Sequence, residues 1–532
     1  MLHYNLSAKN KIIRFIPLFI FSFLLIFGQS FNYAKEVKTS VDIDKLDNYI
    51  KKARKAWNVP GMAVAIVKNG KIVLAKGYGL KNFSKKDQVD KNTLFAIASN
   101  TKAFGSAALS MLVDEGKMKW DDKVQKYLPY FKLYDPYVSA EITIRDLLSH
   151  RSGLGTFSGD LLWYETSYST VDILKRARFL KQKYGFRSGF GYSNIAFMAA
   201  GEVVAAITGK PWKDFIKERF FKPLNMIDTN IGTSELKKYN NVASPHYVKK
   251  GQKTVTVPYT TSDSTGAAAS INSSVSDMAN WLMMLLNKGK VGDKQLISQK
   301  GLEEMWTPYN SFKVSSRYNK MFPSTHFRSY GLGWGLNDYH GKKVISHSGA
   351  LDGMISRVAL VPEEKLGLVI LTNSINGLSS PLTYKIIDTF LDVPSKDWSA
   401  LYLERSEKRS KKKNIKKKEN KTIKKQKLPQ YQINLKEYTG IYGGLMYGDA
   451  KIILKEGKLI LDLLPSPIFI SDLSPLHYDT FNLQLRNTFS FIPGGKGTVQ
   501  FIRNNKGKII EFKLDIPNND FHFYELEFIK KK

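Results

Sequence analysis

The amino-acid sequence predicts an α+β fold, in which an antiparallel sheet flanked by helices is followed by a small all-β barrel-like domain. Helical and strand patterns alternate as far as Leu401, and only short strands broken by glycine turns follow Leu428. At 532 residues with 43% hydrophobic and 12% aromatic content, the chain is long enough to bury a large core in two or more domains. This composition excludes a disordered protein.

The first expected elements are a helix and a pair of strands. Apolar residues recur at helical spacing between residues 46 and 57, and Val59-Pro60-Gly61 ends that pattern. The apolar runs 63–67 and 72–75 are joined by Asn69-Gly70, a pair that favours the tight turn with positive φ at both central residues. The sequence therefore predicts an antiparallel hairpin at the start of the sheet.

Two buried helices and a second strand pair are expected further along. From Ser99 to Glu115 large apolar residues recur at helical spacing among small ones, and Gly116 follows as a stop signal. Residues 281–286 have the pattern of another packed helix. The apolar runs 356–361 and 368–371 are short, and we expect them to form antiparallel strands.

The chain after residue 428 has the pattern of a separate β-rich domain. Two hairpins are predicted, over residues 452–461 and 499–514, each with a glycine in or near its turn. A small barrel or sandwich is expected here. The sequence shows no helix-turn-helix pattern, no phosphate-binding glycine loop before a helix, and no repeat of solenoid length.

The N-terminus has the pattern of an export signal, which we assign to residues 1–34. Three basic residues precede the apolar run Phe15–Phe27, and the small-x-small sequence Gly28-Gln29-Ser30 follows, so that cleavage is expected after Ser30 or Ala34. The run is shorter than the roughly 20 residues of a membrane-spanning helix and contains a proline. We therefore expect an exported protein, periplasmic or extracellular; an uncleaved N-terminal anchor is the alternative.

The net charge of +34 is unevenly distributed along the chain. Between Arg405 and Lys427 thirteen Lys or Arg stand against two Glu, with almost no apolar residues. Such a run predicts a solvated, self-repelling linker, residues 402–427, between a body of residues 41–401 and a β-domain of residues 428–532. Weak contact with an anionic envelope would suit this linker. Nucleic acid is not an expected partner, because no aromatic residues interleave the basic run.

A serine and a lysine are the first candidates for chemistry. The chain has no cysteine, which excludes disulfides, thiolate metal sites and a cysteine nucleophile. Ser99-Asn100-Thr101-Lys102 has the S-x-x-K arrangement where a buried helix is expected to begin, so the Lys102 amine can reach the Ser99 hydroxyl. Burial and the helix dipole lower the pKa of this lysine, and a neutral amine can take the serine proton. The same pattern at Ser410–Lys413 lies in the basic linker.

Two more motifs could complete a catalytic site. In Tyr192-Ser193-Asn194 the phenol could shuttle protons with a lysine, and the amide could hold a substrate carbonyl. His347-Ser348-Gly349 is the only H-x-G of the chain; its imidazole could polarise a tyrosine hydroxyl or bind a substrate carboxylate, or be a satisfied structural histidine. Gly349 would let a substrate lie against the strand.

No metal site is expected, because the remaining histidines lack metal-ligand spacing, including His150, His246 and His326.

Together the three motifs resemble those of class C beta-lactamases, DD-peptidases and related esterases. Their separations of about 90 and about 155 residues suit that family, as do Val59–Ala65 and the segment Leu147–Leu154, Leu-Leu-Ser-His-Arg-Ser-Gly-Leu. The resemblance implies a beta-lactamase/transpeptidase-like fold, with a helical subdomain beside the sheet. The C-terminal part is similar to the β-rich domain that follows many such hydrolases.

The resemblance also implies a role for each motif residue. Ser99 would be the acylated nucleophile, Lys102 its base partner and Tyr192 the general base and acid. Asn194, His347 and Gly349 would contact the substrate. The oxyanion hole would be formed by the backbone N–H groups of Ser99 and Ala350, at about 3 to 4 kcal/mol per donor.

These features predict a serine hydrolase that cleaves an amide or ester acyl bond through a Ser99 acyl-enzyme, without a cofactor. The substrate would be a small molecule or peptide: a D-amino-acid peptide, a beta-lactam or an ester. The third motif is His-Ser-Gly rather than the Lys-Thr-Gly of many beta-lactamases, a form similar to DD-peptidases and esterases. A penicillin- or muropeptide-binding sensor that acylates without turnover is the alternative, and a polybasic envelope-binding protein is a third hypothesis.

Overall fold

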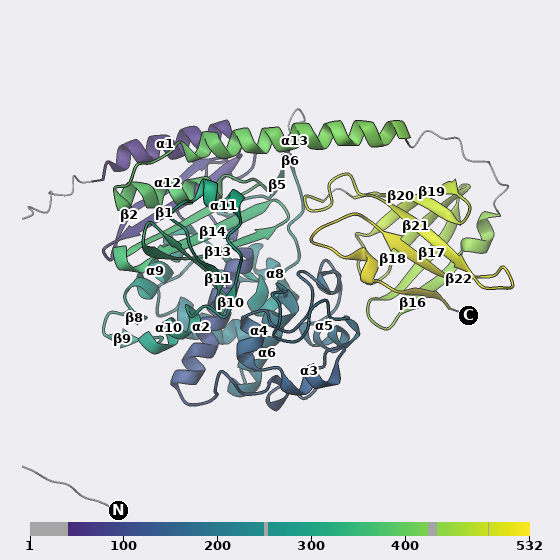
Figure 1. The fold of residues 1–532 in the computed structure, drawn as a ribbon, viewed down its shortest axis with the longest axis horizontal. Coiled ribbons are helices and arrows are strands. Elements are labelled where there is room, and N and C mark those ends of the chain that lie inside the picture. The colour runs from purple at the N-terminus through teal and green to yellow at the C-terminus, as the bar shows by residue number, and fades with distance from the viewer. Residues whose placement is uncertain (1–40, 249–253, 424–433, 488, 532) are drawn as a thin grey trace, which may run out of the picture. The chain divides into compact units, whose positions relative to one another are not determined.

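A computed structural model gives the fold of residues 41–248, 254–423, 434–487 and 489–531 (Figure 1). The expected signal peptide, residues 1–34, lies outside these described residues. The helices are α1 Ile43–Ala56, α2 Thr101–Asp114, α3 Pro136–Glu141, α4 Ile144–Leu148, α5 Thr170–Arg176, α6 Asn194–Thr208, α7 Trp212–Ile216, α8 Thr233–Leu236, α9 Val275–Leu286, α10 Gln299–Met305, α11 Ser316–Met321, α12 Ser379–Leu391 and α13 Trp398–Ile423.

The central sheet has eight strands in the order β10-β11-β12-β13-β14-β15-β1-β2. Its strands are β1 Gly61–Lys68, β2 Lys71–Gly79, β10 Asn310–Ser311, β11 Arg328–Tyr330, β12 Gly335–Tyr339, β13 Lys342–Leu351, β14 Met354–Val361 and β15 Leu366–Thr372. Elsewhere β3 Phe95–Ala96, β7 Ile271–Ser273 and β4 Asn230–Ile231 form a three-stranded sheet in that order. β5 His246–Tyr247 pairs with β6 Val255–Thr256, and β8 Lys290–Val291 pairs with β9 Lys294–Gln295. Every neighbouring pair of the central sheet is antiparallel.

The predicted first hairpin is present as β1 and β2. Asn69 and Gly70 both have positive φ, 53° and 74°, as the tight turn requires. From Met62 to Val67, β1 is buried on both faces because it lies between β2 and β15 and is covered by helices. β1 is therefore an interior strand, whereas β2 forms the edge of the sheet at that end.

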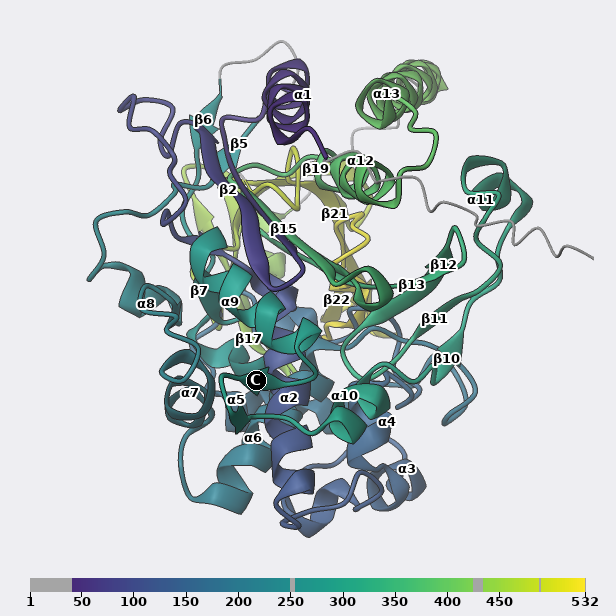
Figure 2. The same ribbon diagram turned by 90° about the vertical axis from the view of Figure 1, so that its left-hand side faces the viewer.

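Helices cover both faces of this sheet. Figure 2 shows α1, α12 and α13 over one face and α9 and α2 beneath the other. α12 packs on β14 and β15, and α9 packs on β1 and β15 from the opposite side. The segment from α2 to α8 supplies the helical subdomain. The predicted α+β fold with a helical subdomain is thus confirmed.

Strand β13 has a paired half and a half with a free edge. Residues Lys342–Ser346 pair with β12, whereas among the described residues the following five, His347–Leu351, pair with β14 alone. The backbone of β13 is therefore open on its β12 side from His347 onward. A free strand edge of this kind can pair with an extended ligand.

The C-terminal region is a closed barrel of eight antiparallel strands, which confirms the predicted all-β domain. β16 closes it by pairing with both β17 and β23. Aromatic rings fill its interior; Phe512 and Phe528 stack at a centroid distance of 4.5 Å. Its strands are β16 Gly440–Gly444, β17 Gly448–Lys455, β18 Lys458–Leu463, β19 Ile470–His477, β20 Thr480–Leu485, β21 Lys496–Arg503, β22 Ile509–Asp515 and β23 Phe528–Lys530.

The segment expected to be a solvated linker is mostly helical. α13 extends to Ile423 and so includes residues 402–423 of the predicted linker. Lysine is a good helix former, and the ion pair between Glu404 and Lys408 has favourable i,i+4 spacing. Trp398 anchors the start of α13 by stacking on Phe322 at 5.3 Å. No helix among the described residues is long and apolar enough to cross a membrane.

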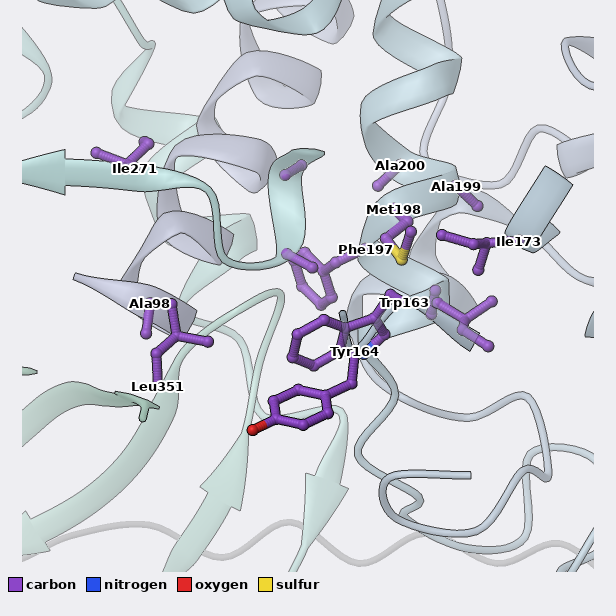
Figure 3. Packing of buried hydrophobic residues seen from close by; sticks show 14 of the residues in the cluster. Ala98, Trp163, Tyr164, Ile173, Phe197, Met198, Ala199, Ala200, Ile271 and Leu351 are labelled. Carbon is purple, nitrogen blue, oxygen red and sulfur yellow. The ribbon is translucent and has the colours of Figure 1, made fainter. Parts of the chain in front are cut away.

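In the core beneath the sheet, α2 packs against α6, α9 and the segment that contains Ala267. Phe104 of α2 stacks on Trp281 at a centroid distance of 3.9 Å, and residues such as Ala98, Trp163, Phe197 and Leu351 belong to the same buried cluster (Figure 3). A Cβ added to Gly105 of α2 would lie 3.0 Å from the Cβ of Ala267. The absent side chain therefore lets α2 pack directly on the segment that contains Ala268.

We expect Gly105→Val to lower the free energy of unfolding by about 2 to 3 kcal/mol, because the added methyl groups overpack the contact with Ala267. Thermal and urea unfolding would measure the change. Lys52→Val, at an exposed position of α1, controls for the small helix-propensity cost of a β-branched residue. Equal unfolding free energies for the two variants would show that the close contact has room to relax.

Candidate active site

Ser99 lies in a single 3-10 turn, Ala98–Asn100, and α2 begins two residues later at Thr101. The sequence placed the helix start at Ser99; the difference arises because Ala98 has φ of 47°, a left-handed conformation that interrupts regular helix. Asn100 donates a side-chain hydrogen bond to Ser356 Oγ at 2.7 Å and so ties the turn to β14. The Ser99 side chain lines a cavity. Strained backbone of this kind is typical of active-site residues.

Lys102 is completely buried directly behind Ser99. Its Nζ lies 3.2 Å from Ser99 Oγ, 2.6 Å from Asn194 Oδ1 and 2.9 Å from the carbonyl oxygen of Ala268. Burial lowers the pKa of Lys102 to about 7. The amine is therefore available in its neutral form near neutral pH.

The three contacts of Lys102 suit a neutral amine that acts as a base. Asn194 Oδ1 and the Ala268 carbonyl can only accept hydrogen bonds, so they take the two N–H groups of the neutral amine. The lone pair then faces Ser99 Oγ, whose hydroxyl can donate to it. The packing thus orients the base toward the nucleophile without a further side chain.

Asp160 is a buried carboxyl that the sequence did not identify as part of the site. Its Oδ2 accepts a hydrogen bond of 2.7 Å from Asn194 Nδ2, and Asn194 accepts from Lys102 through its other amide atom. Burial raises the pKa of Asp160 to about 7. When it is ionised, Asp160 favours the ammonium form of Lys102, so the charge of this carboxyl tunes the base.

The second motif lies where a loop enters α6. Ser193 caps the helix by accepting from the Ala196 N–H, and Asn194 is the first helical residue. Tyr192 precedes the cap and places its ring 4.8 Å from Lys102 Nζ. Burial raises the pKa of Tyr192 well above its usual value, although the Ser99 hydroxyl opposes that shift. Tyr192 therefore holds its proton in the resting site.

His347 belongs to a row of hydrogen bonds with two residues outside the predicted motifs. His150 Nε2 lies 3.3 Å from Tyr330 Oη, which lies 3.0 Å from His347 Nε2. The Ser193 N–H can only donate, so His150 Nδ1 accepts and its Nε2 carries the proton. Each later group then donates to the next, and His347 Nδ1 donates to the Ser348 carbonyl at 2.8 Å.

Both histidines of this row are neutral. Burial, assisted by the charge of Lys102, lowers the pKa of His347 to about 3 and that of His150 well below its usual value. Because both ring nitrogens of His347 already have partners, neither a positive charge nor a free N–H is available for a substrate carboxylate. Of the alternatives that the sequence left open, the geometry favours a histidine that orients strand β13 and Tyr330.

Gly349 brings strand β13 against the nucleophile turn. A Cβ at this position would lie 2.3 Å from the Ile97 carbonyl oxygen and 2.7 Å from Ser99 N. Any side chain would therefore push the strand away from Ser99. The next residue, Ala350, lines the same cavity as Ser99. The proposed oxyanion hole of the Ser99 and Ala350 N–H groups lies at this junction.

The cavity in front of Ser99 has a volume of about 800 Å³, within the size range of small-molecule sites. Its charged lining residues are Arg328, Arg357, Asp160 and Asp520. Aromatic residues of both the body and the barrel line it as well; Trp163 belongs to the body, and Phe491 and Phe521 belong to the barrel. The C-terminal barrel therefore supplies part of the wall of this cavity.

Ser99, Tyr192, Asn194, His347 and Gly349 line one cavity, and Lys102 lies buried behind Ser99. Sequence reasoning missed the side chains of Asp160 and Tyr330. It named His150 but missed its role. His150 stands within the recognised segment Leu147–Leu154, which was the available signal. For Asp160 and Tyr330 no local pattern exists. Among the described residues no group of three His, Asp or Glu lies close enough to hold a metal ion.

Comparison with known proteins places both parts of the chain. A family model described as Beta-lactamase matches residues 46–383, and one described as Domain of unknown function (DUF3471) matches residues 424–530. Unguisins hydrolase ungD' of Aspergillus campestris is 30% identical over 388 aligned residues, which cover 69% of this chain and 70% of that protein. Protein flp of Staphylococcus aureus is 28% identical over 352 aligned residues, which cover 65% of this chain and 64% of that protein.

A solved structure shares the fold over nearly the whole chain. The octameric penicillin-binding protein homologue from Pyrococcus abyssi superposes with a TM-score of 0.60 at 23% identity, covering 92% of this chain and 100% of that one. At this identity the likeness concerns the fold alone. It includes the barrel as well as the body, since the coverage extends beyond the first 400 residues.

We expect Tyr330→Phe to lower the free energy of unfolding by about 2 to 4 kcal/mol, because the His150 N–H and the His347 nitrogen would both lose their partner in a buried place. Chemical denaturation would measure the loss. Tyr134→Phe is the matched control, since Tyr134 is 54% exposed. An unchanged stability of Tyr330→Phe would contradict the hydrogen-bond row.

Proposed function

Because this chain belongs to the beta-lactamase family, we propose that it is a serine hydrolase that cleaves an amide or ester bond through an acyl-enzyme on Ser99. The observation that carries the proposal is the 3.2 Å contact between Ser99 Oγ and the buried Lys102 amine, whose pKa is lowered to about 7. A neutral amine next to an accessible hydroxyl is the arrangement that activates a serine.

In the acylation step Lys102 takes the proton of Ser99 as Oγ attacks the substrate carbonyl carbon. The N–H groups of Ser99 and Ala350 would stabilise the oxyanion that forms. When the bond to the leaving group breaks, Tyr192 gives its proton to the departing nitrogen or oxygen. Tyr192 suits this role because it is protonated in the resting site, and the ammonium on Lys102 can return a proton to it.

In the deacylation step water replaces the leaving group. Neutral Lys102 takes a proton as the water oxygen attacks the acyl carbon, either from water itself or from the Tyr192 hydroxyl, which then accepts the proton of water in its place. The ester bond to Ser99 then breaks, and Oγ recovers a proton from the same pair of residues. The products are the free carboxylic acid and the enzyme in its starting state, so no cofactor is consumed.

The free edge of β13 supports a substrate with an extended main chain, such as a D-amino-acid peptide, although a beta-lactam or a simple ester would also fit the cavity. A relative is named as a hydrolase of unguisins, which supports hydrolysis as the type of reaction. The Arg and Asp residues of the cavity could bind charged groups of either sign. We place this activity outside the cytoplasm, on the export pattern of residues 1–34.

We expect intact-mass spectrometry to detect an adduct on the wild-type protein with at least one of three probes: a penicillin, a D-alanyl peptide and a nitrophenyl ester. Ser99→Ala should form none and lose at least ~10³-fold in turnover. Ser410→Ala, which removes the serine of the second S-x-x-K sequence, should behave like the wild type.

Turnover distinguishes the enzyme from a sensor. Many equivalents of product per protein are expected for a hydrolase. One equivalent followed by a stable adduct would identify the non-catalytic penicillin- or muropeptide-binding protein instead. An adduct that persists in Ser99→Ala would refute the assignment of the nucleophile.

The acylation rate should depend on pH through Lys102. Because the neutral amine is the base and its pKa is about 7, we expect kcat/KM to rise about tenfold per pH unit below pH 7 and to level off above about pH 8. Stopped-flow measurements with the nitrophenyl ester between pH 5 and 9 would test this. A rise of kcat/KM with its midpoint near the ordinary lysine pKa of about 10 would mean that Lys102 is not held neutral.

A further inference from the structure

A glutamate of the C-terminal barrel holds the loop that contains Asp160. Glu525 accepts a hydrogen bond of 2.7 Å from Ser158 Oγ at one carboxylate oxygen and one of 2.9 Å from the Gly159 N–H at the other. Its side chain is 19% exposed, and His522 lies 3.4 Å from Oε1. A carboxylate that binds two adjacent donors fixes both the position and the orientation of this loop.

The held loop lies directly against the second motif. The Phe157 N–H donates to the Tyr192 carbonyl at 2.8 Å, and the Tyr192 N–H donates to Thr156 Oγ1. Gly159 has φ of 79°, and a Cβ there would lie 2.6 Å from Ile195 Cδ1. The loop is thus clamped between α6 on one side and Glu525 on the other.

From this loop a short row of contacts leads to the base. Asp160 follows Gly159 and accepts from Asn194, and Asn194 accepts from Lys102. We propose that Glu525 is a positioning residue for Lys102. Glu525 acts through the loop Phe157–Asp160, and the charge of Glu525 acts on Asp160. This inference rests on the proposed function for its catalytic meaning. It would make the barrel a working part of the hydrolase site.

The charges around this row determine the sign of the effect. Asp160 faces Lys102 from α2 and Tyr192 from the second motif, and it faces Glu525 and His522 from the barrel. Lys102 also faces His150 and His347, which are neutral.

The charge of Glu525 contributes to the raised pKa of Asp160, whereas the Asp160 anion raises the pKa of Lys102. Glu525 therefore favours a neutral Lys102.

Removal of the Glu525 charge should move the base in a defined direction. Without it Asp160 ionises at a lower pH, and the resulting anion stabilises the ammonium form of Lys102. The pKa of Lys102 should therefore rise in Glu525→Gln and fall in Asp160→Asn, where no anion can form. Glu525 also favours the cationic form of His522. The opposing shifts should therefore be compared with the variant His522→Gln, which removes this imidazole alone.

The experiment follows the pKa of Lys102 by direct titration of the free protein and by the pH dependence of acylation. In full-length protein with lysine labelled at ¹³Cε, the Lys102 signal is assigned by its loss in Lys102→Ala and titrated between pH 5 and 10. We expect Glu525→Gln to shift the midpoint upward by roughly 0.5 pH unit and to move the acid limb of nitrophenyl-ester acylation by the same amount. Glutamine can keep both loop contacts, because its oxygen accepts from Gly159 and its amide donates to Ser158.

A control variant separates this effect from loss of barrel docking. Tyr168 Oη donates to the Tyr447 carbonyl at 2.6 Å in another barrel–body contact, so Tyr168→Phe should lower stability without moving either midpoint. Glu525→Ala should move the acid limb in the same direction as Glu525→Gln. It should also reduce the acylation rate on the plateau above about pH 8 roughly tenfold, because the loop loses its clamp. Thermal unfolding would verify that each variant is folded.

The outcomes are distinct for the two proposals. An unmoved Lys102 midpoint in folded Glu525→Gln, or an equal shift in Tyr168→Phe, would overturn the action of the Glu525 charge. An unchanged acylation rate in folded Glu525→Ala would overturn the action through the loop. A shifted midpoint in a protein that no probe acylates would uphold the coupling between Glu525 and Lys102 while the proposed hydrolase function fails. The nuclear magnetic resonance titration thus tests this inference independently of turnover.

Discussion

Burial of a single amine beside a hydroxyl is the constraint on which the rest of the site depends. A lysine removed from water loses its preference for the charged form, and it is tolerated only where each of its N–H groups has an acceptor. Asn194 Oδ1 at the start of α6 and the carbonyl of Ala268 supply these acceptors. The close packing at Gly105 is what brings the second of them within reach.

The fold could be predicted where its signals are local. The turn at Asn69-Gly70 and the apolar helix after Ser99 are short-range patterns, and the structure has both elements. The pairing of β10, β11 and β12 with the rest of the sheet could not be predicted, because these strands are short and owe their place to tertiary contacts. Helix α13 differs from the expected linker because the helix propensity of lysine outweighs the repulsion between the like charges.

The site was predictable to the extent that its residues stand in motifs. Ser99 and Lys102 are three residues apart, so a helix brings them together whatever the remaining fold. Asp160 and Tyr330 reach the same place through long-range packing and carry no sequence signal of their own. The role of His347 required its surroundings, since the hydrogen-bond partners of an imidazole determine whether it offers a proton or accepts one.

The row from Ser193 to Ser348 has a consequence for the electrostatics of the cavity. Its members are neutral, but every bond in it points the same way, and hydrogen bonds arranged in series polarise one another. The final bond draws electron density toward the Ser348 carbonyl oxygen and makes the adjoining peptide N–H of Gly349 more electropositive. The protein thus supplies a permanent dipole at β13 that no change of pH near neutrality can switch off.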